Sequence, residues 1–135
     1  MVPVQHIHPM LVHFPIVFFL TLAVFDVVAL LRGAAITGRS ITGAVSAALA
    51  LGAGVSAVAT YFFGDIALGV AEAGGFRSNI AEIHESLGSV TMAVFAVWAI
   101  VRAVFWWRNL RLSGLPAILI PAIEVAGAIL VVVTA

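Results

Sequence analysis

The stretch that decides the fold is "MLVHFPIVFFLTLAVFDVVALL", residues 10–31. Its apolar run has about the 20 residues that a helix needs to cross the hydrocarbon core of a membrane. The whole chain is 64% hydrophobic and only 9% charged, with a mean hydropathy of +1.24. This composition leaves too few polar side chains to cover a water-soluble globule. The sequence therefore predicts an integral membrane protein.

Three further apolar stretches have the length of a membrane span. With the first, they predict helices over residues 10–31, 41–63, 80–107 and 115–135. Helices are expected because each segment must satisfy its own backbone polar groups in lipid. The connectors are short, except for residues 64–79, where "DIALGVAEA" is expected to form a short interfacial helix. We expect one domain, residues 1–135, folded as an all-α up-down-up-down bundle with its first and third helices diagonal and parallel.

Arginine positions predict the orientation of this bundle. Five arginines lie at the end that carries the first and third connectors, and one lies at the other end; the five are Arg32, Arg39, Arg102, Arg108 and Arg111, and the one is Arg77. By the positive-inside rule, the first end is cytoplasmic. Both termini and the longest connector are then on the periplasmic side of a bacterial inner membrane.

Two histidines on different helices are the main functional signal. Asn79 is the expected N-cap of the third helix, with Glu82 completing a capping box, and His84 follows five residues after that cap. If the first helix starts near Pro9, His13 is at a similar depth, about 6 to 8 Å below the helix ends. Two imidazoles at equal depth on diagonal helices are suited to be the axial ligands of a haem.

Other residues near this level are consistent with a haem. Gly88, one turn below His84, leaves room for a flat ring, and Arg77 and His8 are placed to meet the propionates. His6 and His8 are more simply read as interfacial side chains at a helix entrance. The chain has no cysteine, so disulfides and thiolate metal sites are excluded, while a b-type haem needs none.

Pro15 leaves the start of the first helix open to two interpretations. A proline inside a helix frees the carbonyl four residues earlier, here that of Leu11. Either the helix is kinked just after His13, or its regular part begins at Pro15 and "HPMLVH" is a separate turn. In the second case the argument from matched depth is weaker.

Two carboxylic acids fall inside predicted spans. Glu124 is near the middle of the fourth helix and Asp26 is in the inner half of the first, and an ionised group at a helix centre costs about 2.5 to 3.5 kcal/mol. Both are candidates for a proton or quinol site. The alternatives are a protonated carboxyl that donates to a neighbouring helix, or an ion pair of Asp26 with Arg102.

The second helix is predicted to be a packing element. Its small residues form one row at a spacing of four, namely Ala44, Ala48, Gly52, Ser56 and Thr60. Such a row lets a neighbouring backbone approach closely.

The first segment also resembles a known family. The motif His-Pro-x-x-Val-His-Phe-Pro at residues 8–15, the later Asp26 and the pair Gly64 and Asp65 are similar to the bacterial membrane proteins of the DUF2231 family. The resemblance covers almost the whole chain. It implies a redox context, because relatives occur joined to Rieske or c-type cytochrome domains.

These observations predict a b-type cytochrome-like protein. It would transfer electrons between the quinone pool, or a larger membrane redox complex, and a periplasmic carrier, alone or as a subunit of a quinol-linked oxidoreductase. One alternative is a copper or other metal-binding or transport protein that uses His, Met and carboxylate ligands. Another is an accessory subunit without a cofactor. Lipid contact is expected, an oligomer is compatible with the sequence, and no nucleic-acid partner is expected.

Overall fold

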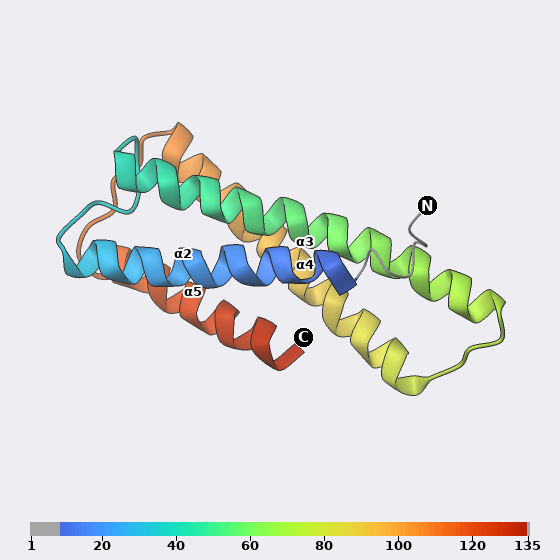
Figure 1. Cartoon of the computed structure of the whole chain (residues 1–135). Helices are drawn as coiled ribbons and strands as arrows, with labels where there is room; N and C mark the ends of the chain where they lie inside the picture. The colour runs from blue at the N-terminus through green and yellow to red at the C-terminus, as the bar shows by residue number, and fades with distance from the viewer. Residues whose placement is uncertain (1–8, 135) are drawn as a thin grey trace.

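The protein is an all-helical chain with four long helices (Figure 1). The computed structural model describes residues 9–134. The helices are α2 (His13–Leu31), α3 (Ile41–Ala73), α4 (Asn79–Trp107) and α5 (Leu115–Thr134). All four are long and apolar enough to cross a membrane, and no strand occurs in the described part of the chain. The predicted fold class is therefore confirmed.

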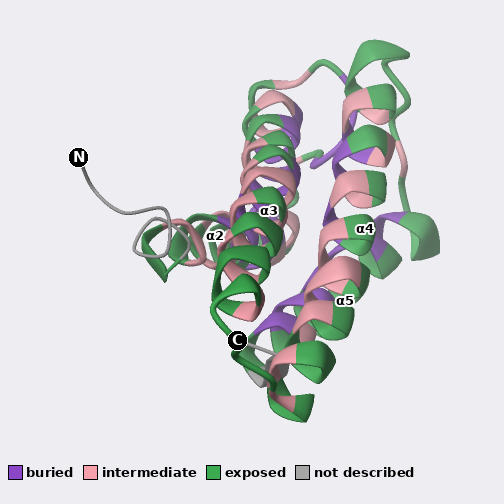
Figure 2. Ribbon diagram, turned by 90° about the vertical axis from the view of Figure 1, so that its right-hand side faces the viewer, coloured by how far each residue is buried: buried purple, intermediate pink, exposed green. Residues whose placement is uncertain are grey.

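Consecutive helices run antiparallel and form a ring. α3 packs against both α2 and α4, and α5 closes the ring by packing mainly against α2 and only lightly against α4 (Figure 1). Large apolar side chains such as Leu31 and Ile41 are exposed on the outside of the bundle, and the buried positions follow its inner faces (Figure 2). An apolar exterior on membrane-spanning helices is suited to contact lipid.

Two contacts across the centre fix the register of the diagonal helices α2 and α4. The rings of Phe19 and Phe95 are stacked with centroids 4.0 Å apart. Deeper in the bundle, Arg102 Nη2 lies 2.6 Å from Asp26 Oδ2. Both pairs join residues that are 76 positions apart in the sequence. A residue of α2 is therefore level with the residue of α4 whose number is 76 higher.

Small residues bring α3 and α4 close together, but on a different face of α3 than the sequence predicts. A Cβ added at Gly54 would lie 2.6 Å from Ala99 Cβ. The buried residues of α3 include Ala47, Ala50 and Ala57, whereas Ala48 of the predicted row is exposed. Other members of the row do pack as predicted: Thr60 is buried, and a Cβ added at Gly52 would lie 2.9 Å from Phe18 Cδ1 of α2.

α3 is longer than predicted. It continues from Ile41 to Ala73, so the residues expected to form a separate interfacial helix are its last turns. Nothing between residues 63 and 73 stops a helix, whereas the Gly74–Gly75 pair, with Gly75 at φ 91°, ends it. At 1.5 Å per residue the 33 residues span about 50 Å, which exceeds the roughly 30 Å hydrocarbon core. The end of α3 and the start of α4 therefore extend past the rest of the bundle (Figure 1).

The start of α4 corrects the predicted cap. Ser78, not Asn79, is the N-cap, and its side chain accepts a hydrogen bond from the backbone N–H of Ala81 at 3.4 Å. Glu82 is then one position too late for the predicted capping box. The first turn still carries this acidic side chain, which suits the positive end of the helix dipole.

The start of α2 resolves the two interpretations of Pro15. Residues 9–11 are helical, a turn falls at Val12, and α2 begins at His13. Pro15 thus lies in the first turn, where a backbone N–H is not needed. The Leu11 carbonyl accepts a hydrogen bond from Thr60 Oγ1 of α3 at 3.1 Å. A hydroxyl of a neighbouring helix thus satisfies the carbonyl that the proline frees, as is common in membrane helices.

Candidate functional site

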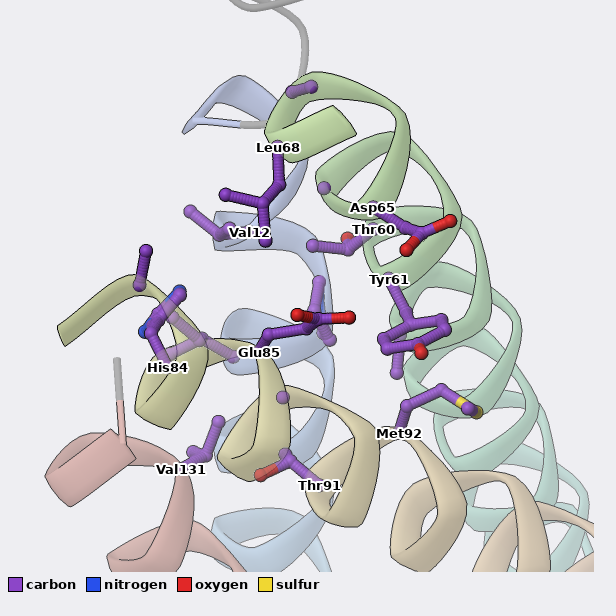
Figure 3. Close-up of a pocket in the computed structure, with 17 residues that line it drawn as sticks. Val12, Thr60, Tyr61, Asp65, Leu68, His84, Glu85, Thr91, Met92 and Val131 are labelled. Carbon is purple, nitrogen blue, oxygen red and sulfur yellow. The ribbon is translucent and has the colours of Figure 1, made fainter. Parts of the chain in front are cut away.

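A cavity of about 300 Å³ opens at the end of the bundle where α2 begins and α5 ends. We call it the His84 cavity. Its walls come mainly from α2, α3 and α4, and Val131 of α5 reaches its edge (Figure 3). The lining is mostly apolar, and its polar side chains are Thr60, Tyr61, Asp65, His84, Glu85 and Thr91. A concave apolar site with a few polar groups is the usual form of a small-molecule or cofactor pocket.

His84 and Glu85 lie side by side on α4 but are directed to different parts of the cavity. Glu85 extends into the space between α4 and α3, toward Tyr61 (Figure 3). His84 is directed to the other side, toward the end of α5 near Val131 (Figure 3). The His84 residue is exposed. The cavity thus combines an imidazole and a carboxylate on one turn of helix.

Gly88 borders open space on the wall of the cavity. It lines the cavity one turn after His84. A Cβ added at Gly88 would meet no heavy atom within 4 Å. The space in front of this residue is therefore open, and a flat ring could lie against the α4 backbone there.

His13 does not lie in the cavity wall. Its neighbours Val12, Pro15 and Ile16 line the cavity, while the His13 side chain is exposed. By the register of α2 and α4, His13 is level with Ser89, and His84 is five residues nearer the open end. Five residues correspond to about 7.5 Å along the helix axis. The equal depth expected from the sequence is therefore not found.

One feature of His13 does suit a ligand. Its Nδ1 lies 3.0 Å from the carbonyl oxygen of Pro9, so a neutral ring that donates this bond leaves Nε2 with a free lone pair. Histidines that bind metals commonly have their second nitrogen held in this way. The His13 ring is thus held in one orientation by this hydrogen bond, but it does not line the His84 cavity.

Of the two residues predicted to contact the haem propionates, the described part of the chain contains only Arg77. Arg77 is exposed in the connector between α3 and α4 and does not line the cavity. His8 lies outside the described residues. Within residues 9–134, no group of three or more His, Asp or Glu side chains is arranged to hold a metal ion.

The predicted pairing of Asp26 with Arg102 is present, and Glu124 joins it. We call these three residues the buried charge cluster. Arg102 Nη2 lies 2.6 Å from Asp26 Oδ2 and Arg102 Nε lies 3.7 Å from Glu124 Oε1. Asp26 and Glu124 are fully buried, and Arg102 is 2% exposed. The first contact is a charge-assisted hydrogen bond, and the second is an ion pair too long to be a hydrogen bond.

Three neutral partners of the cluster were not anticipated from the sequence. Trp98 Nε1 donates to Glu124 Oε1 at 3.0 Å, Ser46 Oγ donates a short hydrogen bond to Asp26 Oδ1, and Arg102 Nη2 donates to the carbonyl of Ile36 at 3.0 Å. Trp98 and Ser46 are polar groups in otherwise apolar helices, which was an available signal. The buried position of Ile36 could not be read from the sequence, because connectors normally lie at the surface.

The connectors beside the cluster hold each other in place. The backbone N–H of Leu112 donates to Thr37 Oγ1 at 2.9 Å, and that of Arg39 donates to Asn109 Oδ1 at 2.8 Å. The Arg39 guanidinium also donates to the Trp107 carbonyl at 2.9 Å. We call the end of the bundle that carries these two connectors, residues 32–40 and 108–114, the arginine-rich end. It is closed by fixed polar contacts, whereas the opposite end contains the His84 cavity.

Comparison with known proteins identifies the chain at the level of a family. A family model described as "Predicted membrane protein (DUF2231)" matches residues 5–135. No curated protein and no solved structure matches.

Proposed function

We propose that this chain, which belongs to the DUF2231 family of predicted membrane proteins, is an electron-transfer protein that binds one b-type haem in the His84 cavity. The observation that supports this most is the position of His84 on the wall of a largely apolar cavity beside the open space at Gly88. A haem needs an axial ligand, for which an imidazole nitrogen is suited, and an apolar slot for its ring. The bound haem would supply one-electron redox chemistry.

The residues of the cavity fit one axial ligand better than the predicted pair. His84 is the ligand that we assign. His13 is about 7.5 Å deeper along the bundle axis and lies off the wall, so it does not face His84 across the cavity. His8, the other histidine that the sequence associates with a haem, lies outside the described residues. The second axial position is therefore open to experiment between His8 and His13.

The setting in the membrane follows the positive-inside rule. The arginine-rich end would face the cytoplasm and the His84 cavity would be near the periplasmic surface of a bacterial inner membrane. Electrons would then pass between a donor in the membrane, such as the quinone pool or a larger redox complex, and a carrier on the periplasmic side. The alternative remains a copper or other metal site with His, Met and carboxylate ligands; the described residues contain no group of three or more His, Asp or Glu side chains arranged for one.

Optical spectroscopy of the purified protein tests this proposal. After expression with a haem supply and purification in detergent, the oxidised and dithionite-reduced protein should show a Soret band and sharp reduced α and β bands. His84→Ala should abolish haem binding, while His84→Met should retain it with a raised reduction potential, because thioether ligation raises the potential. Glu85→Gln is the matched control on the same turn and should keep the spectrum.

The second ligand is identified in the same experiment. His8→Ala and His13→Ala are compared, and the variant that loses the low-spin spectrum identifies the second ligand. A protein that stays colourless after reconstitution with haem, or a spectrum unchanged in His84→Ala, would overturn the proposal.

A further inference from the structure

The buried charge cluster has an unbalanced formal charge. It contains one guanidinium and two carboxyl groups, so with all three ionised it carries a net charge of −1. Asp26 and Glu124 are fully buried, and they are close enough for each to influence the charge of the other. An uncompensated charge in a region of low dielectric constant is strongly unfavourable. One additional proton would make the cluster neutral.

Among residues 9–134, no other ionisable side chain contacts the cluster to balance it. α2 contributes Asp26, α4 contributes Arg102 and α5 contributes Glu124, whereas α3 contributes the hydroxyl of Ser46. The first connector contributes the Ile36 carbonyl. Arg39, in the same connector, is exposed and donates to the Trp107 carbonyl. The charge must therefore be balanced inside the cluster.

The hydrogen bonds indicate where a proton fits. Three of the four carboxyl oxygens accept a hydrogen bond. Asp26 Oδ1 accepts from Ser46, Asp26 Oδ2 accepts from Arg102, and Glu124 Oε1 accepts from Trp98. Glu124 Oε2 is buried and has no hydrogen-bond partner among residues 9–134. A buried carboxylate oxygen without a donor is costly. A proton on Glu124 removes this cost because the side chain of Asp26 is near enough to accept the hydrogen bond.

We propose that Asp26, Arg102 and Glu124 form a proton-binding site in which the two carboxyl groups together hold one proton. The guanidinium of Arg102 is the counter-charge that keeps the other carboxyl ionised. Trp98 and Ser46 position the two carboxyl groups. This site is at the arginine-rich end and does not depend on a haem in the His84 cavity.

The charge count makes an unusual prediction for amide substitutions. In Asp26→Asn or in Glu124→Gln, one carboxylate remains beside Arg102, and the cluster is neutral without any added proton. Each single substitution should therefore remove the proton, even though a carboxyl group is still present. Two carboxyl groups protonated independently would behave differently, since each single variant would keep one carboxylic acid.

Infrared spectroscopy of the full chain in lipid nanodiscs tests this at neutral pH. Isotope labelling of aspartate and glutamate with ¹³C identifies the C=O stretching band of a protonated carboxyl group. We expect one carboxylic acid in the wild-type protein and none in Asp26→Asn or Glu124→Gln. The control Glu85→Gln, in the His84 cavity, should leave the band unchanged.

Each other outcome contradicts the proposal. No carboxylic acid band in the wild-type protein means that the cluster is fully ionised. A band that persists in either single variant means that the carboxyl groups do not share one proton, and a band lost in Glu85→Gln assigns the proton elsewhere. Circular dichroism checks that each variant is folded. If Asp26→Asn does not fold, Glu124→Gln alone decides, because its amide oxygen can still accept from Trp98.

Discussion

The buried charge cluster predicts strong coupling between Asp26→Asn and Glu124→Gln. Each single variant keeps one carboxylate beside Arg102, and its cluster is neutral. The double variant leaves the guanidinium with no counter-charge, at a position that is 2% exposed. Breaking a buried pair so that one charge remains alone costs about 3 to 5 kcal/mol, which is more than either single change should cost.

The expected change in the free energy of unfolding follows from the contacts that each substitution removes. Glu124→Gln loses only the 3.7 Å ion pair and can keep the hydrogen bond from Trp98, so we expect a loss of about 1 kcal/mol in the free energy of unfolding. Asp26→Asn loses the 2.6 Å charge-assisted bond to Arg102, and we expect about 2 kcal/mol. The double variant should lose about 2 kcal/mol more than the sum, within the range seen for residues of one network.

The assay is unfolding of the detergent-solubilised protein by increasing SDS, followed by helical circular dichroism. The four proteins of the cycle are compared under one set of conditions. A second cycle with Asp65→Asn and Glu85→Gln, two carboxylates of the His84 cavity, is the control and should be additive. Additivity of the cluster cycle within about 0.5 kcal/mol would refute the charge-balance reasoning.

Two further predictions concern packing and the helix start. Gly54→Ala should lower the free energy of unfolding by about 1 to 3 kcal/mol, because the new methyl group would lie 2.6 Å from an α4 side chain. Gly88→Ala should lower it far less, because nothing lies within 4 Å of the added Cβ. The same SDS assay measures both variants, and equal losses of stability would contradict the observed packing of α3 on α4. Thr60→Val should cost about 1 to 3 kcal/mol by leaving the Leu11 carbonyl without this donor, whereas Thr91→Val removes a bond within its own helix and should cost less.

The sequence predicted the helices well because lipid imposes a strong constraint on each span. Composition and length were sufficient to place all four helices. Apart from the end of α3, the predicted helix ends lie within a few residues of the observed ones. The end of α3 was missed, because residues 64–73 carry two acidic residues and two glycines that look like a connector, yet contain no residue that stops a helix. A helix that leaves the hydrocarbon region need not end there.

The candidate site was only partly predictable, because the offset between two helices is not encoded locally. His13 and His84 were placed at one depth by counting from the expected helix starts. The true offset is set by the Phe19–Phe95 stack and the Asp26–Arg102 pair, which are far from both histidines. The pairing of Asp26 with Arg102 could be predicted, since a buried charge needs a partner. The hydrogen bond from Arg102 to the Ile36 carbonyl could not be predicted, because it depends on how the first connector folds.

Buried side chains are distributed unevenly along α4. Its buried residues are Phe95, Ala99 and Arg102, all in the second half of the helix, and none occurs in residues 79–94. The start of α4 and the end of α3 extend beyond the rest of the bundle (Figure 1). The first half of α4 contains His84 and much of the cavity wall. Local stability depends on buried contacts, so the first half of α4 should open more easily than the second.

Amide hydrogen exchange in detergent micelles measures this difference. Residues 80–92 of α4 should exchange at least about tenfold faster than residues 95–107, which corresponds to about 1.4 kcal/mol in local opening free energy. The two halves of α3 are the internal control, because its buried residues end at Thr60 and residues 61–73 should also exchange faster. Equal protection along α4 would contradict the reasoning. Because a pocket that must admit a ligand needs mobile walls, this gradient also makes the His84 end, rather than the arginine-rich end, the place where binding is expected.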